Sequence, residues 1–434
     1  MPHSGAMTTP APAPVRPPLA AFWRDLPREG RLLLSIVVVE FVGTGLVLPF
    51  SVVYLHEVRG FALSDVGLLL GVPPLVALAI TGPGGTLIDR LGARTVVIGA
   101  VVLVIASDVV LAFADTLVVA AVAMLLNGLA QGVQFPAFNA MIAAVVPSEA
   151  RQRYFGLNFT LLNLGIGLGG VVGGLVVDVD RAITFQAIYL ADAASFVPIL
   201  LLLLGPLRAV APRPEPHDRE DGDASYRAIL KAPGMRPVIL LVFASAFVGY
   251  AQLNAGMPAY ARVVGEVSTQ GLGIAFAANT VVIVLLQLVV LQRIEGHRRT
   301  RVLVAMGVVW AFSWLLLGLS GLVPGTIGAT LLVAACAAVF ALGETLLQPT
   351  LPAIINDLAP DDLRGRYNAL FSGAFQSASV VAPPIAGALL GADRHTTYIL
   401  LLVAGSLACS YYAVARVERA LPAGANGGAD RAAA

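Results

Sequence analysis

Four acidic side chains lie inside long apolar stretches of the sequence, and they are Glu40, Asp108, Asp192 and Glu344. A charged side chain at the centre of a bilayer costs at least ~2.5–3.5 kcal/mol, so such residues are candidates for binding a proton or a substrate. Burial favours the neutral form of a carboxyl group, and a carboxyl that alternates between neutral and charged forms can carry a proton. The alternative for all four is a carboxyl that only satisfies a hydrogen bond to a neighbouring helix.

Five amide side chains also lie in apolar stretches and are candidates to line a substrate cavity: Asn127, Gln131, Gln134, Gln252 and Asn254. An amide both donates and accepts hydrogen bonds, although a single one often bonds only a neighbouring helix. The histidines lie in tails or between the apolar stretches, and no Ser/His pair, Asp pair or His cluster stands within them. We therefore expect no enzymatic activity, no metal site and no cofactor.

The elements that hold these side chains are twelve apolar stretches, each near the ~20 residues that a helix needs to cross a bilayer. Backbone groups in hydrocarbon must bond within their own segment, and the stretches are too long for barrel strands, so each predicts a transmembrane helix. We place them near residues 32–55, 66–88, 95–114, 118–143, 154–177, 183–204, 237–260, 270–291, 301–320, 328–355, 367–391 and 396–415.

The composition agrees with a membrane protein. Hydrophobic residues make up 58% of the 434 residues and charged residues 12%, whereas a soluble domain has roughly 45–50% and about 25%. A net charge of +1 indicates no nucleic-acid partner. Cys336 and Cys409 both fall in apolar stretches, which argues against a disulfide framework.

The basic residues predict the orientation, because loops on the cytoplasmic side carry an excess of Lys and Arg. Of the 27 basic residues, only Arg59, Arg181, Arg262 and Arg394 fall on one side of the twelve-span arrangement, which leaves 23 on the other. We expect a multi-pass protein of the cell (cytoplasmic) membrane with both termini cytoplasmic.

The chain divides into two similar halves. Gly205 to Arg236 is the longest polar interruption and separates six spans from six. We expect a disordered tail at 1–30, six-helix bundles at 31–204 and 237–416, a cytoplasmic linker at 205–236, and a disordered tail at 417–434. An offset of 213 aligns Pro136, Arg151, Tyr154 and Gly174 with Pro349, Arg364, Tyr367 and Gly387. The halves are therefore predicted to be parallel repeats.

The repeat singles out two of the acids. Glu40 corresponds to Ala246 at an offset of 206, and Glu344 corresponds to Gln131 at an offset of 213. A structural requirement common to both halves would be met in both, so an acid present in one half only fits transport chemistry better. Asp108 and Asp192 are weaker candidates, and Asp108 is close enough to a span end to meet water.

A short motif stands between the second and third spans, where the chain reads Gly85-Thr86-Leu87-Ile88-Asp89-Arg90-Leu91-Gly92-Ala93-Arg94. It resembles the G-x-L-x-D-R-x-G-x-R signature of the major facilitator superfamily, in the family's position. The resemblance implies an all-α membrane fold of twelve helices in two six-helix bundles, related by a pseudo-twofold axis along the membrane normal. It also implies that Gly85, Asp89, Arg90, Gly92 and Arg94 form a gate on the cytoplasmic side and do not bind substrate.

The fifth span resembles the drug:proton antiporter branch of the family. Gly165, Gly169, Gly173 and Gly174 fit the spacing G-x3-G-P-x2-G-G, although Gly170 replaces the proline. The same glycines also suit ordinary close packing of helices. A basic residue that the branch carries in the fourth span, three positions before Gln131-Gly132, is missing, since Gly128 stands there.

These observations favour a secondary active transporter that works by alternating access and exports a small, moderately apolar compound in exchange for protons. The sequence contains no P-loop, which argues against ATP as the direct energy source. The expected partners are a small-molecule substrate, the proton and the lipid bilayer, with the monomer as the functional unit. The alternatives are uptake or facilitated exchange of a small metabolite, and a non-transporting sensor or assembly factor on the same scaffold.

Overall fold

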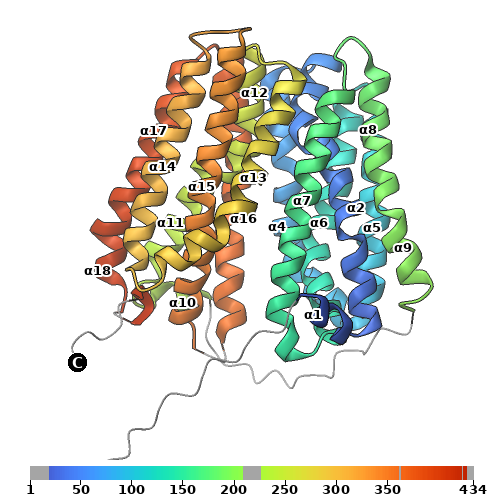
Figure 1. The fold of residues 1–434 in the computed structure, drawn as a ribbon, viewed down its shortest axis with the longest axis vertical. Coiled ribbons are helices and arrows are strands. Elements are labelled where there is room, and N and C mark those ends of the chain that lie inside the picture. The colour runs from blue at the N-terminus through green and yellow to red at the C-terminus, as the bar shows by residue number, and fades with distance from the viewer. Residues whose placement is uncertain (1–18, 209–225, 361–362, 423, 428–434) are drawn as a thin grey trace, which may run out of the picture.

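The computed structural model describes residues 19–208, 226–360, 363–422 and 424–427. Within them, twelve helical spans are long and apolar enough to cross a membrane, and no strand is present. Figure 1 shows the spans standing side by side in two bundles, with blue-to-green helices in one and yellow-to-red helices in the other. The expected fold class is confirmed.

The N-terminal bundle contains the first six spans. The first span is α2 (Arg28–Val47), a 3-10 turn at Leu48–Phe50, α3 (Ser51–Val53) and a π-helical turn at Tyr54–Val58. The others are α4 (Leu63–Leu91), α5 (Ala93–Ala112), α6 (Leu117–Val145), α7 (Ser148–Val176), and α8 (Ala182–Ser195) continued by α9 (Val197–Leu204).

The C-terminal bundle repeats this plan after the short helix α10 (Tyr226–Lys231). Its seventh span is α11 (Met235–Val248), a π-helical turn at Gln252–Gly256 and α12 (Met257–Val263). The rest are α13 (Thr269–Ile294), α14 (Arg299–Ser320), α15 (Ile327–Leu358), α16 (Arg364–Gly391), and α17 (His395–Tyr412) with its extension through a π-helical turn at Ala413–Val417 and α18 (Glu418–Ala420).

Equivalent tyrosines show the repeat at the level of single hydrogen bonds. Tyr54 donates its hydroxyl to the backbone oxygen of Ala112 at 2.7 Å, and Tyr260 donates to that of Gly318 at 3.4 Å. Donor and acceptor both shift by the same 206 residues between the halves. Each tyrosine therefore ties the first span of its bundle to the third.

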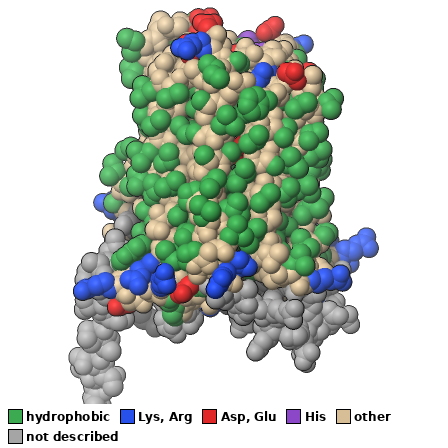
Figure 2. Space-filling model, turned by 90° about the vertical axis from the view of Figure 1, so that its right-hand side faces the viewer, with side chains coloured by type: hydrophobic (Ala, Val, Ile, Leu, Met, Phe, Trp, Pro, Cys, Tyr) green, Lys and Arg blue, Asp and Glu red, His purple; other side chains and the backbone are tan. Residues whose placement is uncertain are grey.

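The molecule has one strongly basic end. Lys and Arg side chains gather there on the face drawn in Figure 2, and a hydrophobic band separates them from the other end. We call the end with Arg90, Arg236, Arg298 and Arg416 the basic end, and the end with Arg262 the opposite end. Exposed apolar side chains on the flanks of the spans, such as Leu331 and Leu400, fit a surface that faces lipid.

The two bundles touch along α4 with α16 and along α7 with α13. Small residues allow this contact. A methyl group on Gly387 of α16 would meet the Leu63 backbone oxygen and lie 3.1 Å from the Gly67 Cα atom. A methyl group on Gly174 of α7 would lie 3.3 Å from the Gly273 Cα atom. These close approaches lie toward the opposite end, and the ribbons diverge toward the basic end (Figure 1).

The structure corrects parts of the expected tails and linker. The tail at 1–30 contains the helix α1 (Leu19–Asp25), whose Phe22 is buried beneath the guanidinium of Arg153 at 4.6 Å. The linker at 205–236 contains α10 and the start of α11. The tail at 417–434 includes an Asn426 side chain that accepts a hydrogen bond from the Thr300 backbone nitrogen at 3.0 Å. That bond satisfies an otherwise free amide at the start of α14. Residues 1–18, 209–225, 423 and 428–434 of the tails and linker lie outside the described part.

Candidate functional site

Glu344 lies in the C-terminal bundle and has a specific partner. Its side chain stands on α15, is 7% exposed, and accepts a hydrogen bond from Asn279 Nδ2 of α13 at 2.8 Å. The same nitrogen lies 3.3 Å from the Ala337 backbone oxygen. Asn279 therefore fixes the position of the carboxyl group relative to two helices.

Tyr250 and Gln348 complete the polar group around this acid. The Tyr250 hydroxyl lies within hydrogen-bonding reach of the Glu344 carboxyl and accepts a hydrogen bond from Gln348 Nε2 at 2.7 Å. Gln348 is exposed, so the group connects a buried acid to an accessible surface. We call Glu344, Asn279, Tyr250 and Gln348 the Glu344 cluster.

Aromatic rings surround the cluster on its apolar side. The Tyr250 ring lies 5.5 Å from Phe375, 6.1 Å from Phe340 and 6.2 Å from Trp310, centroid to centroid. Trp310 stacks on Phe340 at 4.7 Å. Glycines permit this packing, since a methyl group on Gly343 would overlap the Trp310 indole. Trp310 and Phe340 are fully buried, so of these rings only the half-buried Tyr250 and Phe375 can meet an apolar molecule.

Sequence reasoning identified Glu344 but missed Asn279, Tyr250 and Gln348. Asn279 carries the same signal as the amides that were named, a polar side chain within an apolar span. Tyr250 gives no such signal, because a tyrosine is common in any membrane helix. Only the packing of the seventh span against α15 reveals its role.

The three acids of the N-terminal bundle lie near one another. Glu40 on α2 is 7% exposed, and its carboxyl has no hydrogen-bond partner among the described residues. Glu40 is near enough for its charge to act on Asp192 of α8, and Asp192 is near enough to act on Asp108 of α5. Adjacent carboxylates in a low-dielectric setting cannot all be ionised at little cost.

Local contacts explain how Asp192 reaches α2. The Ser195 hydroxyl lies 3.3 Å from the Glu40 backbone oxygen and 2.7 Å from that of Asp192. A methyl group on Gly43 would lie 2.6 Å from Asp192 Oδ1, so glycine makes room for the acid.

Asp108 is only 5% exposed, so the prediction that this side chain meets water is wrong. One of its carboxyl oxygens lacks a hydrogen-bond partner within the described part of the chain.

The amides of α6 share one face of the helix. Asn127, Gln131 and Gln134 are spaced i, i+4 and i+7, and Gln131 Nε2 donates to Asn127 Oδ1 at 2.5 Å. Gly128 and Gly132 pack on α4, while the Ala123 backbone oxygen accepts a hydrogen bond from Ser107 of α5. These contacts occupy the faces of α6 toward α4 and α5. Of the other two faces of α6, one carries the exposed apolar side chains of Val118, Val122 and Leu125, and the other carries the amides. The amides therefore point away from the apolar surface.

The two amides of the seventh span differ from each other. Gln252 is fully buried, accepts a hydrogen bond from the Tyr398 hydroxyl at 2.9 Å, and lies 3.4 Å from the Ala382 backbone oxygen. These contacts join the seventh span to α16 and α17. Asn254 is exposed.

The motif between α4 and α5 makes a sharp reversal at the basic end. Gly92 connects the two helices alone, with φ 81° and ψ 146°, a conformation that only glycine adopts readily. Arg94 donates from Nε and Nη2 to the Leu203 backbone oxygen at 2.8 and 2.6 Å, and so stabilises the C-terminus of α9. Arg90 is exposed. The Asp89 side chain and the surroundings of Gly85 lie outside the described part.

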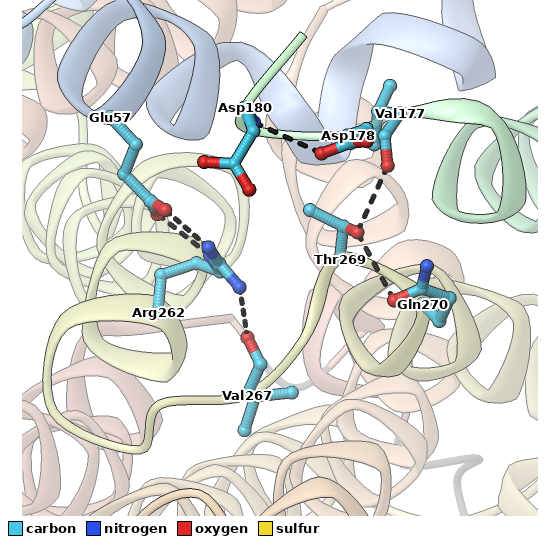
Figure 3. A network of polar contacts seen from close by, with 8 residues as sticks. All are labelled: Glu57, Val177, Asp178, Asp180, Arg262, Val267, Thr269 and Gln270. Atoms are coloured by element: carbon cyan, nitrogen blue, oxygen red, sulfur yellow. Dashed lines mark hydrogen bonds and ion pairs between the residues drawn. The ribbon is translucent and has the colours of Figure 1, made fainter.

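An ion pair joins the two bundles at the opposite end (Figure 3). Arg262 of α12 donates from Nε to Glu57 Oε1 at 2.7 Å and from Nη2 to Glu57 Oε2. Its Nη1 donates to the Val267 backbone oxygen at 2.6 Å. Nearby, the Thr269 hydroxyl of α13 lies 3.4 Å from the Val177 backbone oxygen at the end of α7. This bidentate pair, on residues that sequence reasoning did not select, adds to the close glycine contacts there.

Comparison with known proteins identifies the fold family. The profile of the Major Facilitator Superfamily matches residues 33–329 and 266–433. The chain belongs to the Major Facilitator Superfamily. Among the described residues, no group of three or more His, Cys, Asp or Glu side chains is placed to hold a metal ion.

Curated relatives within the superfamily include bacterial transporters. The chain is 24% identical over 389 residues to an uncharacterised MFS-type transporter, YttB, of Bacillus subtilis, covering 87% of this chain and 91% of that protein. It is 28% identical over 169 residues to the quinolone resistance protein NorA of Staphylococcus aureus, covering 39% and 43%.

Solved structures of the superfamily share the fold. A mutant of the nucleoside transporter NupG has a TM-score of 0.74 at 14% identity, covering 89% of this chain and 99% of that chain. A D-xylose-proton symporter has a TM-score of 0.72 at 14% identity, covering 92% and 98%. Membership of this family implies a multi-pass membrane transporter of a small molecule.

Proposed function

We propose that this chain is a secondary active transporter that exports a small, moderately apolar compound from the cell in exchange for protons. The observation that carries the proposal is the Glu344 cluster. It places one buried carboxyl between a fixed amide donor, Asn279, and an accessible side chain, Gln348, beside a group of aromatic rings. Such a carboxyl can exchange a proton with water and face an apolar substrate at the same time.

We propose that the substrate crosses the membrane by alternating access, in which the site opens first to one end of the molecule and then to the other. The bundles meet at the opposite end through Glu57 with Arg262 and through close backbone contacts. Opening this end requires the ion pair to break, and closing the basic end requires α4 and α16 to pivot about their contact. We propose that Glu344, and Glu40 in the other bundle, bind protons as access alternates, with Asp192 and Asp108 behind Glu40. The α6 amides and Asn254 line the substrate route, while the buried Gln252 holds the seventh span against α16 and α17.

The excess of basic residues leads us to place the basic end and both termini on the cytoplasmic side of the cell membrane. We propose that the monomer is the functional unit. The direction of transport rests on the partial likeness to NorA and on the glycine spacing of α7. The half-buried rings of Tyr250 and Phe375 near Glu344 favour an apolar or flat substrate over a strongly hydrated one.

Transport assays test the proposal in everted vesicles from cells that lack their own exporters. An imposed pH gradient, acidic inside, should drive accumulation of at least one compound from a varied panel that includes a quinolone. Glu344→Gln should abolish this accumulation because the amide cannot exchange a proton, and Glu40→Gln should reduce it. The matched control is Asp115→Asn, which changes an exposed acid in the loop between α5 and α6.

The outcomes separate the proposal from its alternatives. Unchanged pH-driven transport in both Glu344→Gln and Glu40→Gln would remove these acids from proton coupling. Accumulation only in vesicles of the native orientation would indicate uptake. Flux that ignores the pH gradient would indicate facilitated exchange, and no flux across the panel would favour a non-transporting sensor or assembly factor.

A further inference from the structure

Two adjoining pockets lie at the basic end, away from the contact between the bundles. One has a volume of about 480 Å³ and is lined by Arg227, Leu230, Lys231 and Arg236. The other has a volume of about 530 Å³ and is lined by residues of α11, α17 and the extension of α17: Arg236, Pro237, Leu240, Tyr412, Ala415, Arg416, Arg419 and Ala420. Arg236 lines both, so the two pockets are neighbours, and together we call them the basic groove.

The basic groove gathers positive charge. Its five basic side chains, Arg227, Lys231, Arg236, Arg416 and Arg419, are all exposed, and no acidic residue lines either pocket among the described residues. The acid nearest in the chain, Glu418, is engaged elsewhere: it accepts a hydrogen bond from Arg298 Nη1 at 2.9 Å and lies 3.4 Å from Arg301 Nε. The groove therefore attracts an anion.

One wall of the basic groove is apolar. Leu240 is 53% exposed one turn along α11 from Arg236, and Tyr412 and Pro237 line the same pocket. The site lies where α11 begins and α17 ends, so this wall continues onto the apolar flank of the spans. A small soluble anion would gain nothing from contact with an apolar wall. A phospholipid carries a phosphate that matches the basic side chains and acyl chains that match the apolar wall.

The short helix α10 closes the groove from the linker side. Ile229 is buried, which anchors α10 to the bundle, while Arg227 and Lys231 face the pocket. A ligand held between α10 and the end of α17 would connect the linker between the bundles to the last span.

We propose that the basic groove binds one anionic phospholipid, with the phosphate between Arg236 and Arg416 and an acyl chain along Leu240 and Tyr412. Lys231 holds the headgroup from α10, and Arg419 adds charge at the rim. The lipid joins α10 to the C-terminal bundle and stabilises the junction between linker and seventh span.

The test uses full-length protein in nanodiscs of phosphatidylcholine, with and without phosphatidylglycerol, and measures the midpoint of thermal unfolding and the lipids retained in native mass spectrometry. Phosphatidylglycerol should raise the midpoint and leave one tightly retained anionic lipid. Arg236→Gln with Arg416→Gln should remove at least half of the rise and that lipid. Arg181→Gln with Arg394→Gln, exposed arginines at the opposite end, should keep both.

Three results would overturn the proposal. They are an equal rise in both double variants, no rise in the wild-type protein, and a rise reproduced by inorganic phosphate in phosphatidylcholine alone, which would indicate a site for a free anion. The unfolding midpoint of each variant in phosphatidylcholine shows first that it folds. Because no transported substrate is involved, a failure here leaves the proposed transport function intact.

Discussion

The buried acids of the two bundles occupy different surroundings. Glu344 has a fixed amide donor and a neighbouring hydroxyl, whereas the carboxyl of Glu40 has no hydrogen-bond partner among the described residues and lies near a second acid. An acid with fixed neutral donors can be charged at one stage and neutral at another, and an acid near other acids is sensitive to their charge. The asymmetry seen in the sequence therefore extends to the contacts.

Gly92 permits a direct test of backbone strain in the motif. Gly92→Ala forces alanine into a conformation with φ 81°, so we expect the free energy of unfolding to fall by about 1–3 kcal/mol. The thermal unfolding midpoint of purified protein measures the effect. Gly99→Ala is the control, because a methyl group there meets no atom within 4 Å and α5 is helical at that point. Equal unfolding midpoints for the two variants would contradict the claim that alanine is strained at position 92.

At the scale of helices, hydropathy and the offset between the halves predicted most of the architecture. Each apolar stretch became a span, and the offset of 206 that aligns Tyr54 with Tyr260 reappears in their hydrogen bonds. Contacts between distant helices were not predictable in this way. Arg262 and Glu57 stand 205 residues apart, and no periodicity within either helix indicates that they meet. Helix α1 was missed because it is short and lies in a stretch rich in proline and alanine.

The ion pair at the opposite end should control access from that side. We expect a cysteine at Thr280, a buried position facing Gly167 between the bundles, to react slowly with a membrane-impermeant maleimide in intact cells. Glu57→Gln or Arg262→Gln should speed the reaction by a factor of roughly 1.4 to 5, because a partly exposed pair contributes about 0.2–1 kcal/mol. The background replaces Cys336 and Cys409 with alanine.

A charge swap supplies the control for this experiment. The double variant Glu57→Arg with Arg262→Glu can rebuild the pair, so its labelling rate should return toward that of the wild type. Identical rates in all four proteins would show that the pair does not hold the end closed.

The whole molecule is a pair of six-helix bundles closed at one end. The contacts of α4 with α16 and of α7 with α13 relate the bundles symmetrically, and the ion pair and glycine approaches concentrate at the opposite end. Alternating access then requires the two ends to open and close in opposite senses. We propose that protonation of Glu344 shifts the equilibrium between the two states. A ligand, here the proton, shifts an equilibrium only by binding one state more tightly than the other.

Distances between paired spin labels, measured by pulsed electron resonance at acidic and alkaline pH, test this claim most directly. One pair, Asp115→Cys with Leu322→Cys, spans the opposite end, and the other, Leu91→Cys with Glu295→Cys, spans the basic end. As pH changes, one distance should lengthen while the other shortens, and Glu344→Gln should abolish the response. Distances that stay fixed at every pH, or that lengthen together, would contradict the account.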